Sequence, residues 1–128
     1  MAGISPFGWF MRKRRASARE RALQAARNWP VTTAKLLKPV LVPKDEIAEG
    51  TVAQTMQVEI PFYFTLNEGF YGGHVRSVPC SDSEGGRIMR QLGEDLPVKV
   101  RYNSANPDEA IALPEDNEGA LPFTIWPN

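Results

Sequence analysis

The chain has 128 residues, 42% of them hydrophobic and 23% charged, which indicates one folded domain with extensions rather than a disordered or collagen-like chain. Its net charge of zero hides a division. Residues 1–28 hold seven basic residues and one acidic residue (+6), whereas residues 29–128 hold eight basic and fourteen acidic residues (−6). Such asymmetry predicts an arm that meets an anionic surface or folds back on its own acidic body. The single cysteine excludes an intrachain disulfide, and no apolar run in the sequence is as long as a membrane-spanning helix.

The beginning of the sequence does not have the order of a secretory signal. Its apolar stretch, Ile4 to Met11, precedes the basic cluster and is interrupted by Ser5, Pro6 and Gly8. A lone cysteine also fits a reducing compartment. We therefore expect a cytoplasmic protein.

Residues 1–28 are predicted to form an N-terminal arm. Residues 1–11 contain an aromatic patch, and residues 12–28 are rich in Ala, Arg, Leu, Gln and Glu, which favour helix. We expect this helix to end at Asn28, because Pro30 disfavours the helical conformation for Trp29.

From Val31 onward the hydrophobic period becomes two, which predicts strands. Val31–Val42 is expected to form one or two short strands interrupted by Pro39. Residues 43–51 are expected to be a charged loop closed by Gly50. The next segment alternates clearly, so we expect a half-buried antiparallel strand. Its apolar face consists of Met56, Val58, Ile60, Phe62, Phe64 and Leu66.

A hairpin is predicted after this strand. Its loop would be Asn67-Glu68-Gly69, with Gly69 taking a positive φ, and the return strand would run from Phe70 to Val78. Ser81 to Glu84 has the spacing of a capping box, which predicts a short helix that Gly93 ends. The inward side chains of this helix would be Ile88, Met89 and Leu92.

Two more strands are expected near the C-terminus. Val98, Val100 and Tyr102 share one face of the first, and after a turn at Asn103–Pro107 a final short strand holds Ile111 and Leu113. The apolar tail Leu121–Pro127 is either a strap over the domain's own open edge or a partner-docking peptide. Packing on the domain is favoured, because exposed edges promote aggregation.

These elements predict a mainly β fold: a five- or six-stranded antiparallel barrel or sandwich with one short internal helix and an N-terminal helix. The predicted organisation is an arm at 1–28, a β-rich domain at 29–114 and an acidic, then apolar, tail at 115–128.

The order of motifs resembles the bacterial Domain of Unknown Function 3592 family over roughly residues 29–113. The resemblance is carried by Trp29-Pro30, the aromatic strand to Phe64, the turn with Gly69, Phe70-Tyr71, and Val98-x-Val100-x-Tyr102 followed by Asn106-Pro107. The chain departs from the family at Asn103-Ser104, where members usually have Asp-Pro, and it lacks the transmembrane helices that many members carry. The resemblance implies a small β-rich domain near a membrane and implies no catalytic or ligand-binding residue.

Catalytic chemistry is not predicted. Cys80 and His74 are the only Cys and His, and six residues of strand would separate them by about 20 Å unless the chain bends. Two such residues are also too few for a structural zinc site. The adjacent carboxylates lie in charged loops or turns, where no difference of environment separates their roles. These pairs are Asp45/Glu46, Glu94/Asp95 and Asp108/Glu109. We expect no enzyme activity, no metal and no cofactor.

A weaker hypothesis concerns anion binding at Ser83-Glu84-Gly85-Gly86-Arg87. Free backbone N–H groups at a helix start and Arg87 would suit a phosphate. However, the spacing matches no phosphate-binding motif, and helix capping alone accounts for Ser81 to Glu84.

The arm carries the strongest functional signal. Aromatic rings followed by four basic residues can insert at a membrane interface while the bases stay at the headgroups. The candidate contact residues are Phe7, Trp9, Phe10, Arg12, Lys13, Arg14 and Arg15. The alternatives are packing of the arm on the domain or in a homo-oligomer, and contact with nucleic acid.

The predicted function is a non-catalytic binding or interaction module, peripheral on the inner face of the membrane through this arm. The alternative is an oligonucleotide-binding-like β-barrel with Tyr63, Tyr71 and Tyr102 as stacking residues. The −6 charge of residues 29–128 makes nucleic acid the less favoured partner.

Overall fold

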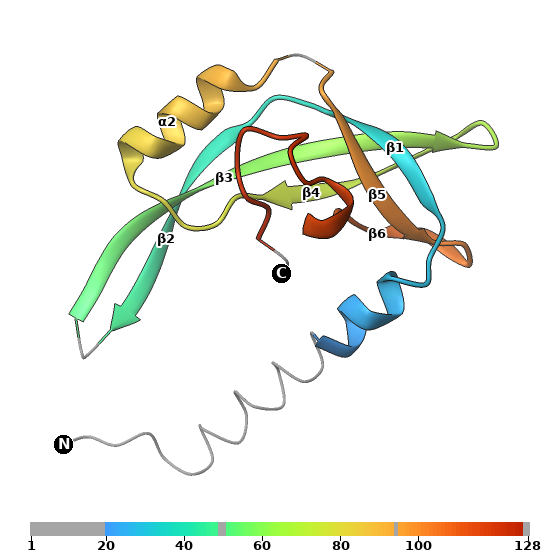
Figure 1. Cartoon of the computed structure of the whole chain (residues 1–128), viewed down its shortest axis with the longest axis horizontal. Helices are drawn as coiled ribbons and strands as arrows, with labels where there is room; N and C mark the ends of the chain where they lie inside the picture. The colour runs from blue at the N-terminus through green and yellow to red at the C-terminus, as the bar shows by residue number, and fades with distance from the viewer. Residues whose placement is uncertain (1–19, 49–50, 94, 127–128) are drawn as a thin grey trace, which may run out of the picture.

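A computed structural model describes residues 20–48, 51–93 and 95–126 (Figure 1). The described chain is mainly β, as predicted, with antiparallel strands that form a curled half-barrel. Residues 20–26 are helical, and residues 27 and 28 form a turn, so the described helix ends close to the expected Asn28. The other elements are β1 (Val31–Leu36), β2 (Val40–Ala48), β3 (Thr51–Leu66), β4 (Gly69–Arg76), α2 (Asp82–Gln91), β5 (Pro97–Asn103), β6 (Asn106–Ile111) and the 3-10 helix η1 (Pro114–Asp116).

The sixteen-residue strand β3 organises the sheet. One edge of β3 pairs with β2 and then with β1, which lie end to end, and the other edge pairs with β4. Leu36 pairs with Phe62 and Val40 with Glu59, so the register shifts by one residue between β1 and β2. This interruption falls at Pro39, where it was predicted. β5 continues the sheet beyond β1, and β6 beyond β5.

The expectation of a charged loop at 43–51 is wrong. Residues Pro43–Ala48 belong to β2 and pair with Thr51–Met56 of β3, and the predicted closing residue Gly50 lies outside the described residues. The N–H and C=O groups of Met56 both bond to Cys80 on the other side of β3, at 2.8 Å each. Pro43 opposes Met56, so its backbone points to the free edge of β2, where the missing N–H breaks no ladder bond.

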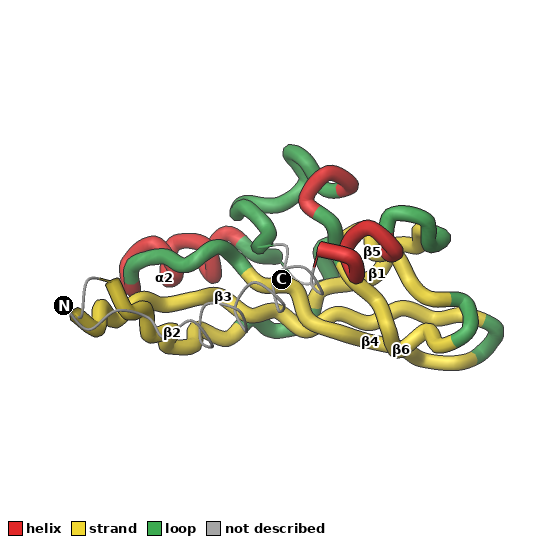
Figure 2. The backbone as a smooth tube through the Cα atoms, turned by 90° about the horizontal axis from the view of Figure 1, so that it is seen from below, coloured by secondary structure: helices red, strands yellow, loops and turns green. Residues whose placement is uncertain are grey.

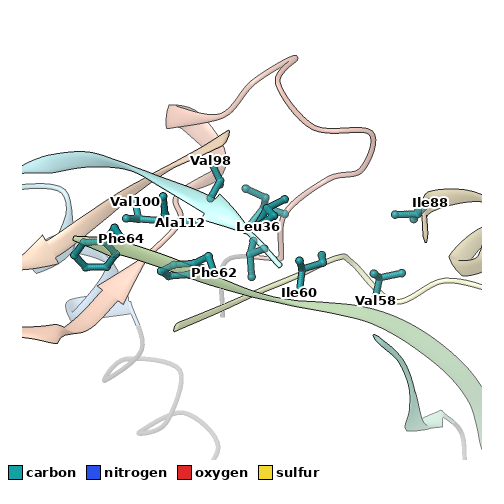
Figure 3. Packing of buried hydrophobic residues seen from close by; sticks show 12 residues of the cluster. Leu36, Val58, Ile60, Phe62, Phe64, Ile88, Val98, Val100 and Ala112 are labelled. Carbon is teal, nitrogen blue, oxygen red and sulfur yellow. The ribbon is translucent and has the colours of Figure 1, made fainter. Parts of the chain in front are cut away.

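The core lies on the inner face of the half-barrel (Figure 3). The alternation predicted for β3 is confirmed from Val58 to Phe64, because Val58, Ile60, Phe62 and Phe64 are each at most 3% exposed. It is not followed at Met56, which is half-buried, and Gln57, which is 4% exposed although it belongs to the opposite face. The opposite face of the strand is more open to solvent at Tyr63 and Thr65. The buried cluster consists of Ala34, Leu36, Val58, Ile60, Phe62, Phe64, Val75, Ile88, Val98, Val100, Ala112 and Ile125.

The β3–β4 hairpin is confirmed, but its turn differs from the prediction. Asn67 (φ 48°) and Glu68 (φ 70°) both take positive φ, which a two-residue turn of this kind requires. Gly69, which was expected to take that role, is the first residue of β4 and pairs with Leu66. The return strand ends at Arg76 rather than Val78.

Helix α2 packs on the β2–β3 part of the sheet (Figure 2). The predicted cap is confirmed, because the Ser81 hydroxyl accepts a hydrogen bond from the Glu84 N–H at 3.1 Å. Ile88 is buried, and Met89 and Leu92 pack against the core. The helix ends at Gln91, and its C-cap residue Leu92 has an extended backbone, so Gly93 does not end the helix through a positive φ.

The C-terminal segment packs on the domain, which the sequence favoured. The Val78 N–H donates to the Thr124 carbonyl at 3.1 Å, and the Trp126 N–H donates to the Arg76 carbonyl at 2.8 Å. Ile125, between them, is 5% exposed, and Leu121 and Phe123 also contact the core. Residues 124–126 therefore lie beside residues 76–78, joined to them by the antiparallel bridge between Ser77 and Ile125.

Candidate functional site

The predicted contact residues of the arm lie outside the described residues. They are Phe7, Trp9, Phe10, Arg12, Lys13, Arg14 and Arg15. What the structure describes is the root of the arm, from residue 20 to Pro30, and the way in which it joins the domain.

The root is fixed to the C-terminal half of the chain. Ala26 is 1% exposed. The Arg101 guanidinium donates from Nη1 to the carbonyl oxygens of Arg27 and Trp29, at 2.8 and 3.2 Å. The Arg27 Nε lies 2.9 Å from the Glu115 Oε1. Arg27, directly after the described helix, is thus held beside η1.

Two carboxylates of η1 are paired at this root. Arg101 binds Asp116 through two hydrogen bonds, Nε to Oδ2 at 2.8 Å and Nη2 to Oδ1 at 3.0 Å, a bidentate geometry. These bonds lower the pKa of Asp116 and raise that of Arg101. The hydrogen bond from Arg27 likewise lowers the pKa of Glu115. Basic residues from two distant segments therefore hold both η1 carboxylates in the charged form.

A cleft of about 350 Å³ lies between the β3–β4 and β5–β6 turns. We call it the mouth cleft; it is lined by Leu66, Asn67, Tyr71, Tyr102, Ser104 and Pro107. The rings of Tyr71 and Tyr102 each lie 5.8 Å from the Phe64 ring, centroid to centroid. The core thus ends in a row of three aromatic rings, and the two outer rings reach the cleft. Both tyrosines were predicted as stacking residues of the alternative function, but their position in one cleft depends on the register of two separate hairpins, which no local sequence pattern contains.

A larger cleft, of about 660 Å³, separates α2 from the C-terminal segment. Cys80, Glu84 and Arg87 line part of it. Arg87 donates to both Glu84 carboxylate oxygens and, at 3.0 Å, to the Gln91 side chain. The hydrogen bond from Arg87 lowers the pKa of Glu84. The guanidinium expected to meet a phosphate at this helix start is therefore directed to groups on its own helix.

His74 and Cys80 make separate contacts. His74 Nε2 lies 3.9 Å from Glu59 Oε1, and the Cys80 thiol donates to the Met56 carbonyl oxygen at 3.6 Å. Cys80 lies beside α2, near Gly85. Within residues 20–48, 51–93 and 95–126, no three His, Cys, Asp or Glu residues are grouped as metal ligands would be. No helix in the same ranges is both long and apolar enough to cross a bilayer.

One exposed feature was not predicted. Phe70 is 75% exposed on the outer face of the sheet, and its ring lies 6.4 Å from that of Tyr63. The alternation of β3 already assigned Tyr63 to the outer face, but the pairing of Thr65 with Phe70 was needed to bring the two rings together.

Comparisons of the chain with protein-family models, with curated proteins and with solved structures give no match. The resemblance to the Domain of Unknown Function 3592 family therefore stays a prediction. The geometry of the described residues defines a small half-barrel with a firmly attached arm root and several surface clefts, the mouth cleft among them.

Proposed function

We propose that the protein is a non-catalytic binding module that attaches to the cytoplasmic face of a membrane through residues 1–28. The observation that carries the proposal is the charge division, with +6 on the arm and −6 on the rest of the chain. Each basic residue near an anionic leaflet contributes about 1 kcal/mol. Each deeply inserted aromatic ring contributes about 1.5–3 kcal/mol, before the entropy of ordering the arm is subtracted.

The contacts at the arm root support this proposal in two ways. Arg101 and Glu115 hold the root against the domain, so a membrane-bound arm would keep the domain close to the lipid surface. The carboxylates nearest the root, Glu115 and Asp116, are already paired with Arg27 and Arg101. This pairing weakens the repulsion between the domain and an anionic surface.

The experiment is co-sedimentation of the full chain with anionic and neutral vesicles at low and moderate salt. The first variant replaces the four clustered bases of the arm, Arg12, Lys13, Arg14 and Arg15, with Gln. A matched control removes four exposed bases from the domain instead, at Lys35, Lys38, Arg90 and Lys99. We expect the full chain and the control to sediment with anionic vesicles only, and the arm variant to bind more weakly by nearly three orders of magnitude, about 1 kcal/mol for each of the four bases. The proposal is wrong if the full chain stays in the supernatant at low salt, or if both variants lose binding equally.

A third variant, with Ser at Phe7, Trp9 and Phe10, separates insertion from simple charge attraction. Loss of binding at moderate salt, with binding retained at low salt, is the result expected for inserted rings. Deletion of residues 1–28 is a poorer test, because it also removes the buried Ala26 and the Arg27–Glu115 ion pair.

The alternative function, an oligonucleotide-binding-like β domain, is favoured by one observation. Phe70 and Tyr63 form an exposed aromatic pair on the sheet, with Lys35 opposite Tyr63 on the neighbouring strand. Stacked bases and a nearby cation are the elements of single-strand binding. A gel-shift assay with single-stranded RNA and DNA at low salt tests it, and no shifted band for the full chain would exclude it.

A further inference from the structure

The mouth cleft has the chemistry of a peptide-recognition groove. Its apolar surface comes from the rings of Tyr71 and Tyr102 together with Leu66 and Pro107, and its polar groups are two phenols, the Asn67 amide and the Ser104 hydroxyl. We propose that this cleft binds a proline-rich segment of a partner protein, with a basic residue of that segment at its acidic rim. The proposal gives the binding module a class of partner. It rests on the proposed function as a binding module and does not depend on attachment to a membrane.

The aromatic rings are held in place before any ligand arrives. Tyr71 and Tyr102 lie on different hairpins, and each packs 5.8 Å from Phe64, which is 3% exposed. Side chains fixed in this way lose little conformational freedom on binding. A polyproline II segment is itself preformed and docks on grooves lined by aromatic rings, so both partners avoid a large ordering cost.

The polar groups of the cleft suit the backbone of such a segment. A polyproline II helix has no internal hydrogen bonds, so its carbonyl oxygens are free to accept. The phenols of Tyr71 and Tyr102 and the amide of Asn67 are donors, and all three line the cleft. The volume of about 350 Å³ lies at the lower end for ligand sites, which fits two or three residues rather than a nucleotide cofactor.

The charge at the rim selects among ligands. Glu68 follows the lining residue Asn67, and Asp108 and Glu109 follow the lining residue Pro107; all three are exposed and none lines the cleft itself. The Glu109 carboxylate accepts from the Asn103 and Asn106 side chains at 3.3 Å each, which leaves Glu68 and Asp108 as the carboxylates open to a cation of the ligand. Residues 66–69 and 103–109, which form the two turns and the start of β6, contain no Lys or Arg. An acidic rim repels phosphate groups, which disfavours nucleic acid at this cleft, and it attracts a cation on the ligand.

The experiment is an NMR titration of the ¹⁵N-labelled full chain, without vesicles. The probe is a peptide of about eight prolines followed by one arginine, and the matched peptide has glycine in place of every proline. We expect saturable shifts for residues 66–71 and 102–107 with the proline peptide and no saturable shifts with the glycine peptide. Y71F and Y102F keep the packing on Phe64 and should each weaken binding about three- to tenfold, through loss of one hydrogen bond.

Tyr63 supplies a matched control, because it lies on the outer face and does not line the cleft. Y63F should leave the affinity unchanged. The proposal is overturned by the absence of saturable shifts up to about 2 mM peptide, by shifts centred on the outer face or on α2, or by equal binding of the glycine peptide. Vesicle binding with no peptide binding would overturn this proposal alone, and the reverse result would overturn only membrane attachment.

Discussion

Asn117 satisfies both backbone polar groups of Lys99 with its side chain. The Asn117 Oδ1 accepts from the Lys99 N–H at 2.8 Å, and its Nδ2 donates to the Lys99 carbonyl at 3.0 Å. The same Nδ2 also donates to the Leu113 carbonyl at 3.0 Å. β6 pairs with β5 only from Arg101 onward, so a side chain takes the place of a neighbouring strand at Lys99.

Replacement of Asn117 by Ala should lower the free energy of unfolding by about 2–4 kcal/mol. Asn117 is 6% exposed, so the groups it leaves behind lose their partners where water has little access. Asn117→Asp should cost as much or more, because an oxygen would then face the carbonyls of Lys99 and Leu113. Urea denaturation measures both, and Glu118→Ala at the exposed neighbour should change stability by less than about 0.5 kcal/mol. Unchanged unfolding of Asn117→Ala would mean that these bonds do not hold the edge of β5.

The sequence was sufficient to predict the strands whose two faces differ. Val58, Ile60 and Phe62 alternate with residues that are more exposed, so hydrophobic period alone predicts β3 and its inner face. It failed at Pro43–Ala48, where the charged residues suggested a loop. There the pairing with β3 decides the conformation. Such pairing is a tertiary interaction, which a local sequence pattern does not predict.

The mouth cleft and the Asn117 contacts could not be predicted from the sequence. Tyr71 and Tyr102 are separated by thirty-one positions in the chain (71 to 102) and line the same cleft because both pack on Phe64. Asn117 looks like an ordinary loop residue until the end of β6 leaves Lys99 unpaired. For the arm, in contrast, the functional hypothesis comes from composition alone, because residues 1–19 lie outside the described residues.

Acid should remove the contribution of the Arg101–Asp116 pair to stability. The pKa of Asp116 is lowered below its usual 3.8, chiefly by the hydrogen bonds from Arg101, so the folded protein favours the charged carboxylate. A lowered folded-state pKa stabilises the protein above the unfolded-state pKa, and this stabilisation is lost as the pH falls through the folded-state pKa. Wild type should therefore be more stable than Asp116→Asn at neutral pH, and the difference should shrink below about pH 4.

Urea denaturation at a series of pH values measures this convergence. Glu118→Gln removes an exposed carboxylate two residues away and should show no comparable change between neutral and acid pH. A stability difference for Asp116→Asn that stays constant down to the lowest pH would show that the variant perturbs packing rather than an ion pair.

Gly73 should not tolerate a side chain. A Cβ at this position would lie 2.7 Å from the Phe62 Cζ, and Phe62 is only 2% exposed, so its ring has little room to move. Gly73→Ala should destabilise by about 1–3 kcal/mol. The same change at Gly86 in α2 meets only the flexible Arg90 side chain at 3.4 Å and should stabilise by about 0.5–1 kcal/mol through helix propensity. Thermal unfolding should therefore show opposite shifts, and two shifts of the same sign would contradict the packing of Phe62 on Gly73.

Ile125 should anchor the C-terminal segment to the domain. Its side chain is 5% exposed in the core cluster, and its backbone neighbours bond to Arg76 and Val78. Ile125→Ala should lower the free energy of unfolding by about 2–4 kcal/mol, through lost burial and the cavity that remains. Thr124→Ala is the matched control, because the exposed Thr124 side chain is removed while its carbonyl still accepts from Val78. If both variants unfold at the wild-type temperature, the segment contributes no stability to the domain, and its apolar residues are then better explained as a peptide that docks on another molecule.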